Sequence, residues 1–344
     1  MIMKFQIIIV FGLFLLLGCS STDQSNGLQP QPLELEMFDY FEDEIPFSGP
    51  GSHTISLDND QIAALGRILF YDNRLSLNNS ISCAHCHQQK NGFSDNVRFS
   101  RGLENYETSR NSMTLVNNAF QRRHFWEGHS GLMEDHILDP ISNHIEMGMR
   151  STEDLVYKLS VTDDYIRLFE EVYDEEVSED LVHESLSTFV ASLISYNSKF
   201  DKGQEVDFAN FTATELAGKD LFFGKAKCGQ CHKGDHYTST WRSTANIGLD
   251  LNYKDEGAGD GKFKIPTLRN IELTSPYMHD GRFETLDQVV NHYTSGIQDH
   301  PRLDWELRNG IQLSEIEKEQ LIDFLLTLTD YEFIAEKKFS NPFR

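Results

Sequence analysis

Two short segments of this chain combine cysteine and histidine at a spacing that can do chemistry. Each follows the pattern Cys-x-x-Cys-His, once at Cys83, Cys86 and His87 and again from Cys228 through Cys231 to His232. Two thiols separated by two residues can each form a thioether bond to a vinyl group of one porphyrin. The histidine that follows can then bind the iron. This spacing is the attachment signature of c-type haem.

A single segment of this kind could also be half of a zinc site or a redox-active dithiol. The chain has five cysteines, and only Cys19 lies outside the two segments. Two copies with the same trailing histidine therefore favour haem over the alternatives. The sequence predicts two covalently bound haem c groups, with His87 and His232 as iron ligands.

The segments that lead into the two haem sites resemble each other. Residues 58–70 have apolar side chains at helical spacing, and Thr212 with Glu215 forms a capping box before a second helical stretch. The stretches 66–71 and 218–223 align as Gly-Arg-Ile-Leu-Phe-Tyr and Gly-Lys-Asp-Leu-Phe-Phe. We interpret this similarity as an internal duplication of a cytochrome c-like helical unit.

The rest of the chain also has mainly helical periodicity, and strand patterns are limited to a few short runs. Further helices are expected at 152–159, 164–173 and 179–194, and after capping boxes that begin at Thr285 and Ser314. The predicted fold class is all-α, with two cytochrome c-like haem domains. We expect the N-terminal haem domain at 55–200 and the C-terminal one at 201–344.

The N-terminus has the pattern of an export signal. A lysine at position 4 precedes an almost wholly apolar stretch, which ends in Leu16-Leu17-Gly18-Cys19. This ending resembles a bacterial lipobox, so residues 1–18 are expected to be a lipoprotein signal peptide and Cys19 the lipidated residue. An uncleaved anchor is the alternative, although the stretch is short for a membrane span. The polar residues 19–54 are expected to form a flexible tether, with the protein exported to the periplasm and anchored to a membrane.

The composition is that of a globular protein with a strong negative charge. Hydrophobic residues make up 39% of the chain, and the formal net charge is -24. This charge argues against binding to nucleic acid or to an anionic membrane surface, and it would suit a basic protein partner.

Several separated motifs resemble the bacterial di-haem cytochrome c peroxidase family, including its MauG branch. They include Phe125-Trp126-Glu127-Gly128, Ile145-Glu146-Met147, Ile265-Pro266-Thr267-Leu268-Arg269-Asn270 and Pro276-Tyr277-Met278-His279-Asp280-Gly281. They occur in the family's order, and the resemblance extends from about Leu65 to Leu328. It implies hydrogen peroxide as substrate and a small c-type cytochrome or cupredoxin as electron donor. Members of the family tend to form homodimers, although nothing in this sequence indicates an interface.

The resemblance implies roles for several residues near the N-terminal haem. Glu146 matches the distal acid–base glutamate, Trp126 the tryptophan that relays electrons between the haems, and Pro140 a proline that lines the distal pocket. At position 136 the family usually has glutamine, whereas this chain has His136. We predict that His136 lies in the distal pocket and shares the acid–base chemistry with Glu146; the alternative is that it hydrogen bonds elsewhere.

The resemblance also implies a calcium ion between the two domains. Its oxygen donors would come from Asn111, Thr274 and Pro276. Side-chain and backbone oxygens suit this hard cation. The sequence has no acidic calcium loop of the usual kind, so this expectation rests on the resemblance alone.

The second ligand of the C-terminal haem departs from the peroxidase pattern. Ordinary di-haem peroxidases have a methionine fourteen residues after the histidine of the His-Asp-Gly motif, but here this position is Tyr293. Tyrosine at this position matches the MauG branch. On a helix that begins after Thr285, Tyr293 would share the apolar face of its neighbours. Met278 and His292 are the rival ligands, and simple packing of Tyr293 against the haem is the other alternative.

The loop at 99–109 is the second departure. Many di-haem peroxidases carry a histidine here that blocks the N-terminal haem in the oxidised protein, but this loop has none. We therefore expect an open, high-spin N-terminal haem that needs no reductive activation.

The sequence leaves three candidate functions. The first is a periplasmic cytochrome c peroxidase, and the second is a MauG-like high-valent di-haem oxidant that acts on a protein or small molecule. The third is an electron-transfer cytochrome, for which Glu146 would be dispensable.

Overall fold

The computed structural model describes residues 33–40, 60–238 and 244–343 of the chain. It is mostly helical, with 44% helix and 6% strand, so the predicted helical fold class is confirmed. The described residues from Glu34 onward belong to one compact unit. The predicted signal peptide, Cys19 and much of the predicted tether lie outside the described residues.

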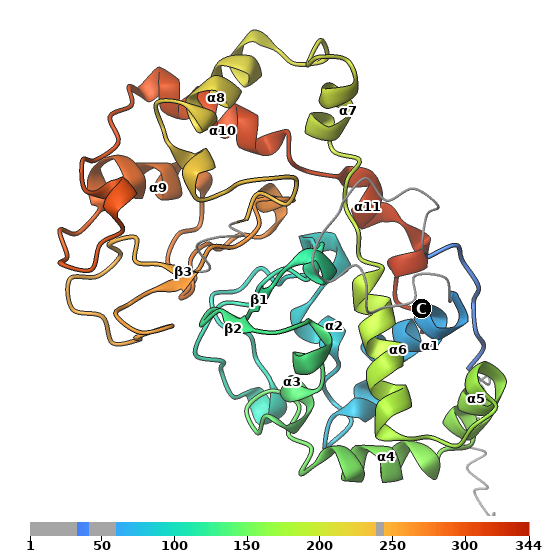
Figure 1. The fold of residues 1–344 in the computed structure, drawn as a ribbon. Coiled ribbons are helices and arrows are strands. Elements are labelled where there is room, and N and C mark those ends of the chain that lie inside the picture. The colour runs from blue at the N-terminus through green and yellow to red at the C-terminus, as the bar shows by residue number, and fades with distance from the viewer. Residues whose placement is uncertain (1–32, 41–59, 239–243, 344) are drawn as a thin grey trace, which may run out of the picture. The chain divides into compact units, whose positions relative to one another are not determined.

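Eleven α-helices and four two-residue strands are found in the described part of the chain (Figure 1). The helices are α1 Asp60–Tyr71, α2 Cys83–Cys86, α3 Asp139–Ser142, α4 Thr152–Ser160, α5 Asp163–Tyr173, α6 Glu179–Ala191, α7 Lys199–Glu205, α8 Ala213–Phe223, α9 Leu286–Asn291, α10 Glu315–Leu326 and α11 Tyr331–Ala335. The strands form two antiparallel pairs, β1 Arg123–His124 with β2 His129–Ser130 and β3 Thr244–Ala245 with β4 Phe263–Lys264.

The predicted capping boxes begin the helices that position the C-terminal haem site. The side chains of Thr212, Thr285 and Ser314 accept hydrogen bonds from the third residue of α8, α9 and α10, and the reciprocal bonds are also present. These contacts satisfy backbone N–H groups that the first helical turn leaves without partners. The predicted helices at 152–159, 164–173 and 179–194 correspond to α4, α5 and α6.

The same helix packing occurs in each half of the chain, between a helix that precedes the haem-attachment segment and one that follows it. Helix α1 packs against α6, and α8 packs against α10 (Figure 1). A Cβ atom at Gly66 would lie 2.8 Å from Cβ of Phe189, and one at Gly218 would lie 2.8 Å from Cβ of Phe324. Both distances are shorter than side chains tolerate, so glycine allows each pair of helices its close approach.

Part of the predicted tether packs on the folded chain. Tyr40 is 2% exposed and its N–H donates to Asp60, while Glu36 forms ion pairs with Arg67 and Lys337. Arg67 also donates to the backbone oxygen of Ser340. Residues 34–40 therefore join α1 to the C-terminal tail, because their aromatic and acidic side chains find partners there.

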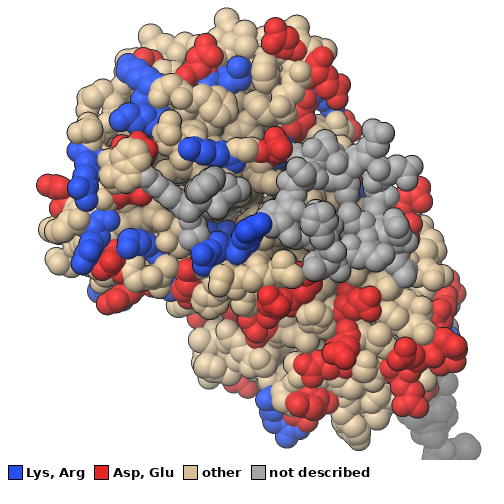
Figure 2. Space-filling model, viewed as in Figure 1, with Lys and Arg blue, Asp and Glu red and all other residues tan. Residues whose placement is uncertain are grey.

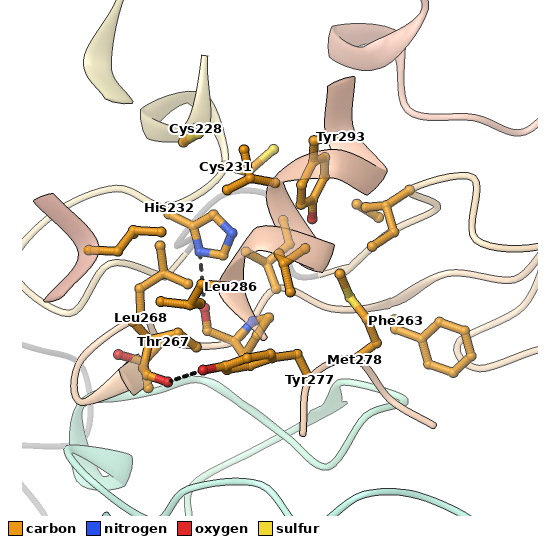
Figure 3. Close-up of a pocket in the computed structure, with 18 of the residues that line it drawn as sticks. Cys228, Cys231, His232, Phe263, Thr267, Leu268, Tyr277, Met278, Leu286 and Tyr293 are labelled. Carbon is orange, nitrogen blue, oxygen red and sulfur yellow. Dashed lines mark hydrogen bonds between the residues drawn. The ribbon is translucent and has the colours of Figure 1, made fainter. Parts of the chain in front are cut away.

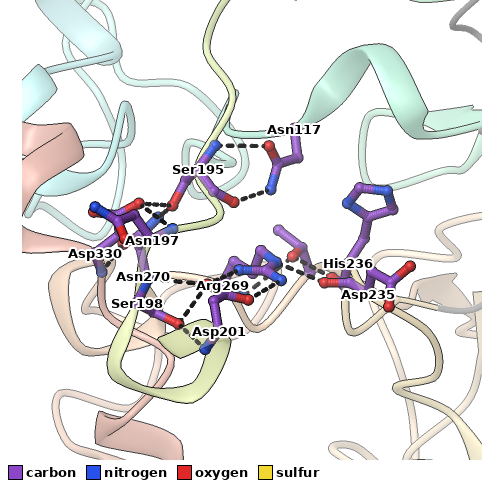
Figure 4. A network of polar contacts seen from close by, with 11 residues as sticks. Asn117, Ser195, Asn197, Ser198, Asp201, Asp235, His236, Arg269, Asn270 and Asp330 are labelled. Atoms are coloured by element: carbon purple, nitrogen blue, oxygen red, sulfur yellow. Dashed lines mark hydrogen bonds and ion pairs between the residues drawn. The ribbon is translucent and has the colours of Figure 1, made fainter. Parts of the chain in front are cut away.

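A buried polar network holds the segment between α6 and α7 (Figure 4). Asn117 exchanges two hydrogen bonds of 2.9 Å with the backbone of Ser195, whose hydroxyl donates to Asp330. Asn270 donates to the same hydroxyl, and its amide oxygen accepts from the N–H of Asp330. Asn270 of the Leu-Arg-Asn motif thus helps to fix the segment that joins the two halves of the chain.

Charge is distributed unevenly on the face shown in Figure 2. Asp and Glu side chains dominate the lower right of this view, where Figure 1 places α4 to α6, while Lys and Arg gather over the C-terminal half. None of the helices in the described ranges is long and apolar enough to cross a membrane.

Candidate haem sites and the residues around them

The first attachment segment forms the short helix α2 and the residue that follows it. Cys83 and Cys86 lie one turn apart, and Nδ1 of His87 donates to the backbone oxygen of Phe93 at 3.0 Å. Burial lowers the pKa of His87, which favours the neutral imidazole. With Nδ1 committed to a carbonyl group, Nε2 is the nitrogen that remains for a metal.

The second attachment segment repeats this arrangement. Cys228 begins a short 3-10 helix at Cys228–Gln230, and Nδ1 of His232 contacts the backbone oxygen of Tyr237 at 3.0 Å. The oxygen of Pro266 lies 3.1 Å from the same nitrogen. Burial lowers the pKa of His232 as well. Both histidines are therefore held in the tautomer that suits an axial ligand.

A cavity of about 210 Å³ lies beside the second segment (Figure 3). Cys228, Cys231 and His232 line it together with Trp126 and many apolar side chains. None of the four cysteines of the two segments is disulfide-bonded. Two thiols that form no disulfide, next to a neutral histidine and a largely apolar cavity, fit a covalently attached haem.

Tyr293 and Met278 both point into this cavity (Figure 3). Burial raises the pKa of Tyr293, and the neighbouring Cys228 and Cys231 add to the rise. His292 does not line the cavity; its Nε2 lies 2.9 Å from the oxygen of Ile247. The geometry thus supports Tyr293 or Met278 as the second ligand and disfavours His292.

The backbone around Tyr293 differs from the expected helix. Helix α9 ends at Asn291, and Tyr293 lies in a π-helix at His292–Gly296. The wider turn places the phenol in the cavity that Leu286, Val289 and Val290 also line. Single π turns within helices are common at functional sites. Sequence periodicity assumes a regular helix, so it could not show this turn.

Trp126 lies where the two halves of the chain meet. Its indole Nε1 donates to the oxygen of Asn111 at 2.8 Å, and its ring lies 6.4 Å from that of His279. His279 is 6% exposed and stacks on Phe263. Trp126 lines the cavity of the second site, which is compatible with a relay between haems.

Glu146 is a half-buried carboxyl group near the first attachment segment. Burial raises the pKa of Glu146 to about 7, the negative charge of Asp139 adds to the rise, and a hydrogen bond from Asn143 opposes it. That bond joins the Asn143 amide nitrogen to Oε1 over 2.9 Å. Glu146 in turn contributes to the raised pKa of both the Cys83 and the Cys86 thiol, after burial as the main cause. The carboxyl group thus lies within electrostatic reach of both thiols.

The loop at 99–109 lies beside Glu146. The N–H of Leu103 donates to the oxygens of Ile145 and Glu146 at 2.9 and 2.8 Å. The loop that lacks the blocking histidine is therefore bound to the backbone that carries the carboxyl group.

His136 lies in a cluster of rings rather than against Glu146. Its ring is within 5.7 Å of those of His124, Phe125 and His129, measured between centroids. Its Nδ1 is 3.1 Å from Asp139, the residue whose charge raises the pKa of Glu146. The described contacts therefore link His136 to Glu146 through Asp139, and a direct role in the distal pocket stays a prediction.

The remaining predicted residues lie near these two sites. Pro140 is in the first turn of α3, and its oxygen accepts from the N–H of Met147. The three predicted calcium ligands, Asn111, Thr274 and Pro276, all line the cavity of the second site. The amide nitrogen of Asn111 donates to Val97, which leaves Oδ1 as the atom for a cation.

Sequence reasoning assigned no role to four residues at these sites: Asp139, Asn143, Lys264 and His279. Asn143 stands three residues before Glu146, a spacing that could have indicated a partner. Lys264 gave no such signal. It alternates with Phe263 and Ile265, a pattern typical of a lysine that faces solvent. In the structure, Lys264 is the buried residue of this short strand and Phe263 is half-buried.

Comparisons with known proteins agree with these two sites. The family model for di-haem cytochrome c peroxidase matches residues 60–207. The methylamine utilization protein MauG of Methylorubrum extorquens is 33% identical over 280 residues, which cover 77% of each chain. The cytochrome c551 peroxidase of Nitrosomonas europaea is 32% identical over 289 residues, covering 80% of this chain and 82% of the relative. A crystal structure of a MauG-like protein associated with microbial copper homeostasis superimposes with a TM-score of 0.76 at 31% identity, covering 88% of this chain and 99% of that one.

The fold and the two haem-attachment sites thus define a di-haem, peroxidase-type oxidoreductase. The chain belongs to the bacterial di-haem cytochrome c peroxidase and MauG family. Its similarity to the two named relatives is nearly equal, so identity alone does not separate the peroxidases from the MauG branch.

Proposed function

We propose that this protein reduces hydrogen peroxide to water at the His87 haem, with electrons from a small c-type cytochrome or cupredoxin. The observation that carries this proposal is Glu146, a half-buried carboxyl group beside the Cys83 and Cys86 attachment segment, oriented by Asn143. When bound, the haem supplies the iron at which peroxide is reduced.

Glu146 has the acid–base properties that this reaction requires. In its ionised form it can accept the proton from one peroxide oxygen and return it to the other, which then leaves as water. A pKa of about 7 lets the same group accept and donate a proton near neutral pH. The loop at 99–109 has no histidine to compete for the haem. We therefore expect a high-spin N-terminal haem in the oxidised protein, detectable by electron paramagnetic resonance without prior reduction.

Electrons would enter at the His232 haem and reach the first site by way of Trp126. The position of Trp126 at the second cavity, with its indole tied to Asn111, supports this order. We further propose that Asn111, Thr274 and Pro276 bind a calcium ion that holds the two halves together.

A MauG-like oxidant is the second candidate, and Tyr293 favours it. The phenol oxygen lies in the cavity of the second site, where a phenolate would be a hard, anionic iron ligand. Such a ligand lowers the reduction potential relative to methionine. A C-terminal haem of low potential suits the storage of oxidising equivalents better than the acceptance of electrons from a carrier.

The repeated packing of α1 with α6 and of α8 with α10 supports an internal duplication. We propose an N-terminal and a C-terminal haem domain that meet at the segment 192–198. The expected boundary after residue 200 would fall inside α7, whose Asp201 pairs with Arg269 of the C-terminal half.

We also propose that the protein is an exported, periplasmic lipoprotein with Cys19 as its anchor, and that it forms a homodimer as other family members do.

Peroxide turnover by the purified diferric holoprotein separates the two candidates. Pre-reduced soluble cytochrome c would serve as the donor, and wild type would be assayed beside Glu146→Gln. Rapid donor oxidation that is lost in the variant would support the peroxidase. Negligible donor oxidation together with a long-lived spectral change upon addition of peroxide would instead support the MauG-like oxidant.

A further inference from the structure

Lys264 is a buried cation at the second haem cavity that no step above uses. It lies on β4, is 7% exposed and lines the same cavity as Cys228 and His232. Its ammonium group donates to the side-chain oxygen of Gln121. Among the residues that the structure describes, no carboxylate forms an ion pair with Lys264, including the two that line the same cavity, Asp304 and Glu306.

A buried ammonium group with one neutral acceptor is costly. Charged groups inside proteins are normally paired, because the loss of hydration costs several kcal/mol per ion. Burial alone lowers the pKa of Lys264 to about 7. Two of its three N–H donors also have no acceptor among the described contacts. A negatively charged oxygen in the cavity would both neutralise the ammonium charge and accept hydrogen bonds from the remaining N–H donors.

The haem of this site carries such oxygens. Cys228 and Cys231 would hold the haem through thioether bonds to its vinyl groups, and its two propionate carboxylates are the anionic groups that it would bring into the cavity. Lys264 lies where the cavity meets the N-terminal half. Its backbone N–H donates to the backbone oxygen of Trp126 at 2.8 Å, and its ammonium group donates to Gln121. Both Trp126 and Gln121 line the cavity.

We infer that Lys264 is the counter-ion of a propionate of the C-terminal haem, held in place by Gln121. The ion pair positions the propionate edge next to Trp126 and raises the reduction potential of this haem, because a nearby positive charge favours the added electron. The inference rests on the second haem of the family and not on which oxidant or substrate the protein uses.

The test is a spectroelectrochemical titration of the C-terminal haem in the holoprotein at one fixed pH. Lys264→Gln removes the charge, and we expect the reduction equilibrium constant to fall at least tenfold, which is about 59 mV for a one-electron couple. Lys264→Arg keeps the charge and should stay close to wild type. Lys262→Gln is the matched control, because Lys262 is two residues away, pairs with Asp260 and has a side chain that is 39% exposed.

A Lys264→Gln potential that matches that of Lys262→Gln, with both haems incorporated, would overturn the inference. If Lys264→Gln does not assemble, an experimental structure of the wild-type holoprotein decides instead. A propionate oxygen within about 3.2 Å of Nζ supports the ion pair, and both propionates lying farther away refute it. Neither measurement needs peroxide, so a failed turnover assay and a failed inference are distinguishable.

Discussion

The two haem sites share one attachment unit but differ in what surrounds it. In each, a glycine lets one helix approach another, a Cys-x-x-Cys-His segment follows, and the histidine Nδ1 meets the oxygen of an aromatic residue. That residue is Phe93 in the first site and Tyr237 in the second, and both have left-handed backbone, with φ of 56° and 48°. Attachment is thus built alike in the two halves.

The functional difference lies in groups that arrive from elsewhere in the chain. The first site has the carboxyl group of Glu146 and a loop without histidine, whereas the second has the phenol of Tyr293, the ammonium group of Lys264 and Trp126. The groups at the first site can move protons, whereas those at the second can set the reduction potential of the haem and pass electrons. The comparison teaches that the attachment motif alone cannot assign a role to a haem.

The largest effect should come from removing the carboxylate of the first site. Glu146→Gln keeps the size of the side chain but removes the proton acceptor, so we expect donor-dependent peroxide turnover to fall about 10²–10⁴-fold. Reduction of the C-terminal haem by the donor, measured in the same sample without peroxide, should be unchanged.

Glu104→Gln is the control, because this exposed residue lies in the loop beside Glu146. If Glu146→Gln turns over peroxide like this control, Glu146 is not the acid–base group and the two sites are not divided as proposed.

Because the two halves share the same helix packing, the matching Gly→Ala substitution should lower stability equally in each half. Gly66→Ala and Gly218→Ala each place a Cβ against the facing helix, 2.8 Å from Cβ of Phe189 or Phe324. Overpacking of this kind costs about 1–3 kcal/mol. The measurement is the thermal unfolding midpoint of the holoprotein, followed by circular dichroism.

Gly234→Ala serves as the reference for this pair. A Cβ there meets no atom within 4 Å, so only its φ of 66° opposes the change, at a cost of about 1–2 kcal/mol. Unequal losses for Gly66→Ala and Gly218→Ala, with one no larger than this reference, would show that the two helix pairs are not equivalent.

Local patterns predicted the shared parts well and the differences less well. Capping boxes, helical periodicity and the Cys-x-x-Cys-His spacing are properties of neighbouring residues, and they gave α8, α9, α10 and both attachment segments. The π turn at Tyr293, the link from His136 to Asp139 and the burial of Lys264 depend on contacts between distant segments. Single-sequence periodicity carries no information on such contacts, so only a family resemblance could point to Tyr293 and Glu146.

A third prediction concerns the ligand of the second site. Tyr293→Met replaces a hard anionic donor by a soft neutral one, so the reduction potential of the C-terminal haem should rise. We expect a change of at least tenfold in the reduction equilibrium, about 59 mV, by spectroelectrochemistry. Met278→Leu, which alters the rival ligand in the same cavity, should leave the potential near that of wild type. The reverse pattern would assign the ligand to Met278.

The smallest expected effect is a shift in pH dependence that separates Asp139 from His136. Glu146 must be ionised to accept a proton, so kcat/KM for peroxide should fall as pH drops below its pKa of about 7. The negative charge of Asp139 raises this pKa, so Asp139→Asn should move the acid limb to lower pH while the plateau stays within a few-fold of wild type.

His136→Gln leaves Asp139 in place and tests whether the histidine itself takes part in the acid–base chemistry. If His136 shares the acid–base chemistry, this variant lowers the plateau or changes the shape of the profile. An unchanged profile would leave Glu146 as the acid–base group, with Asp139 as the residue that sets its pKa.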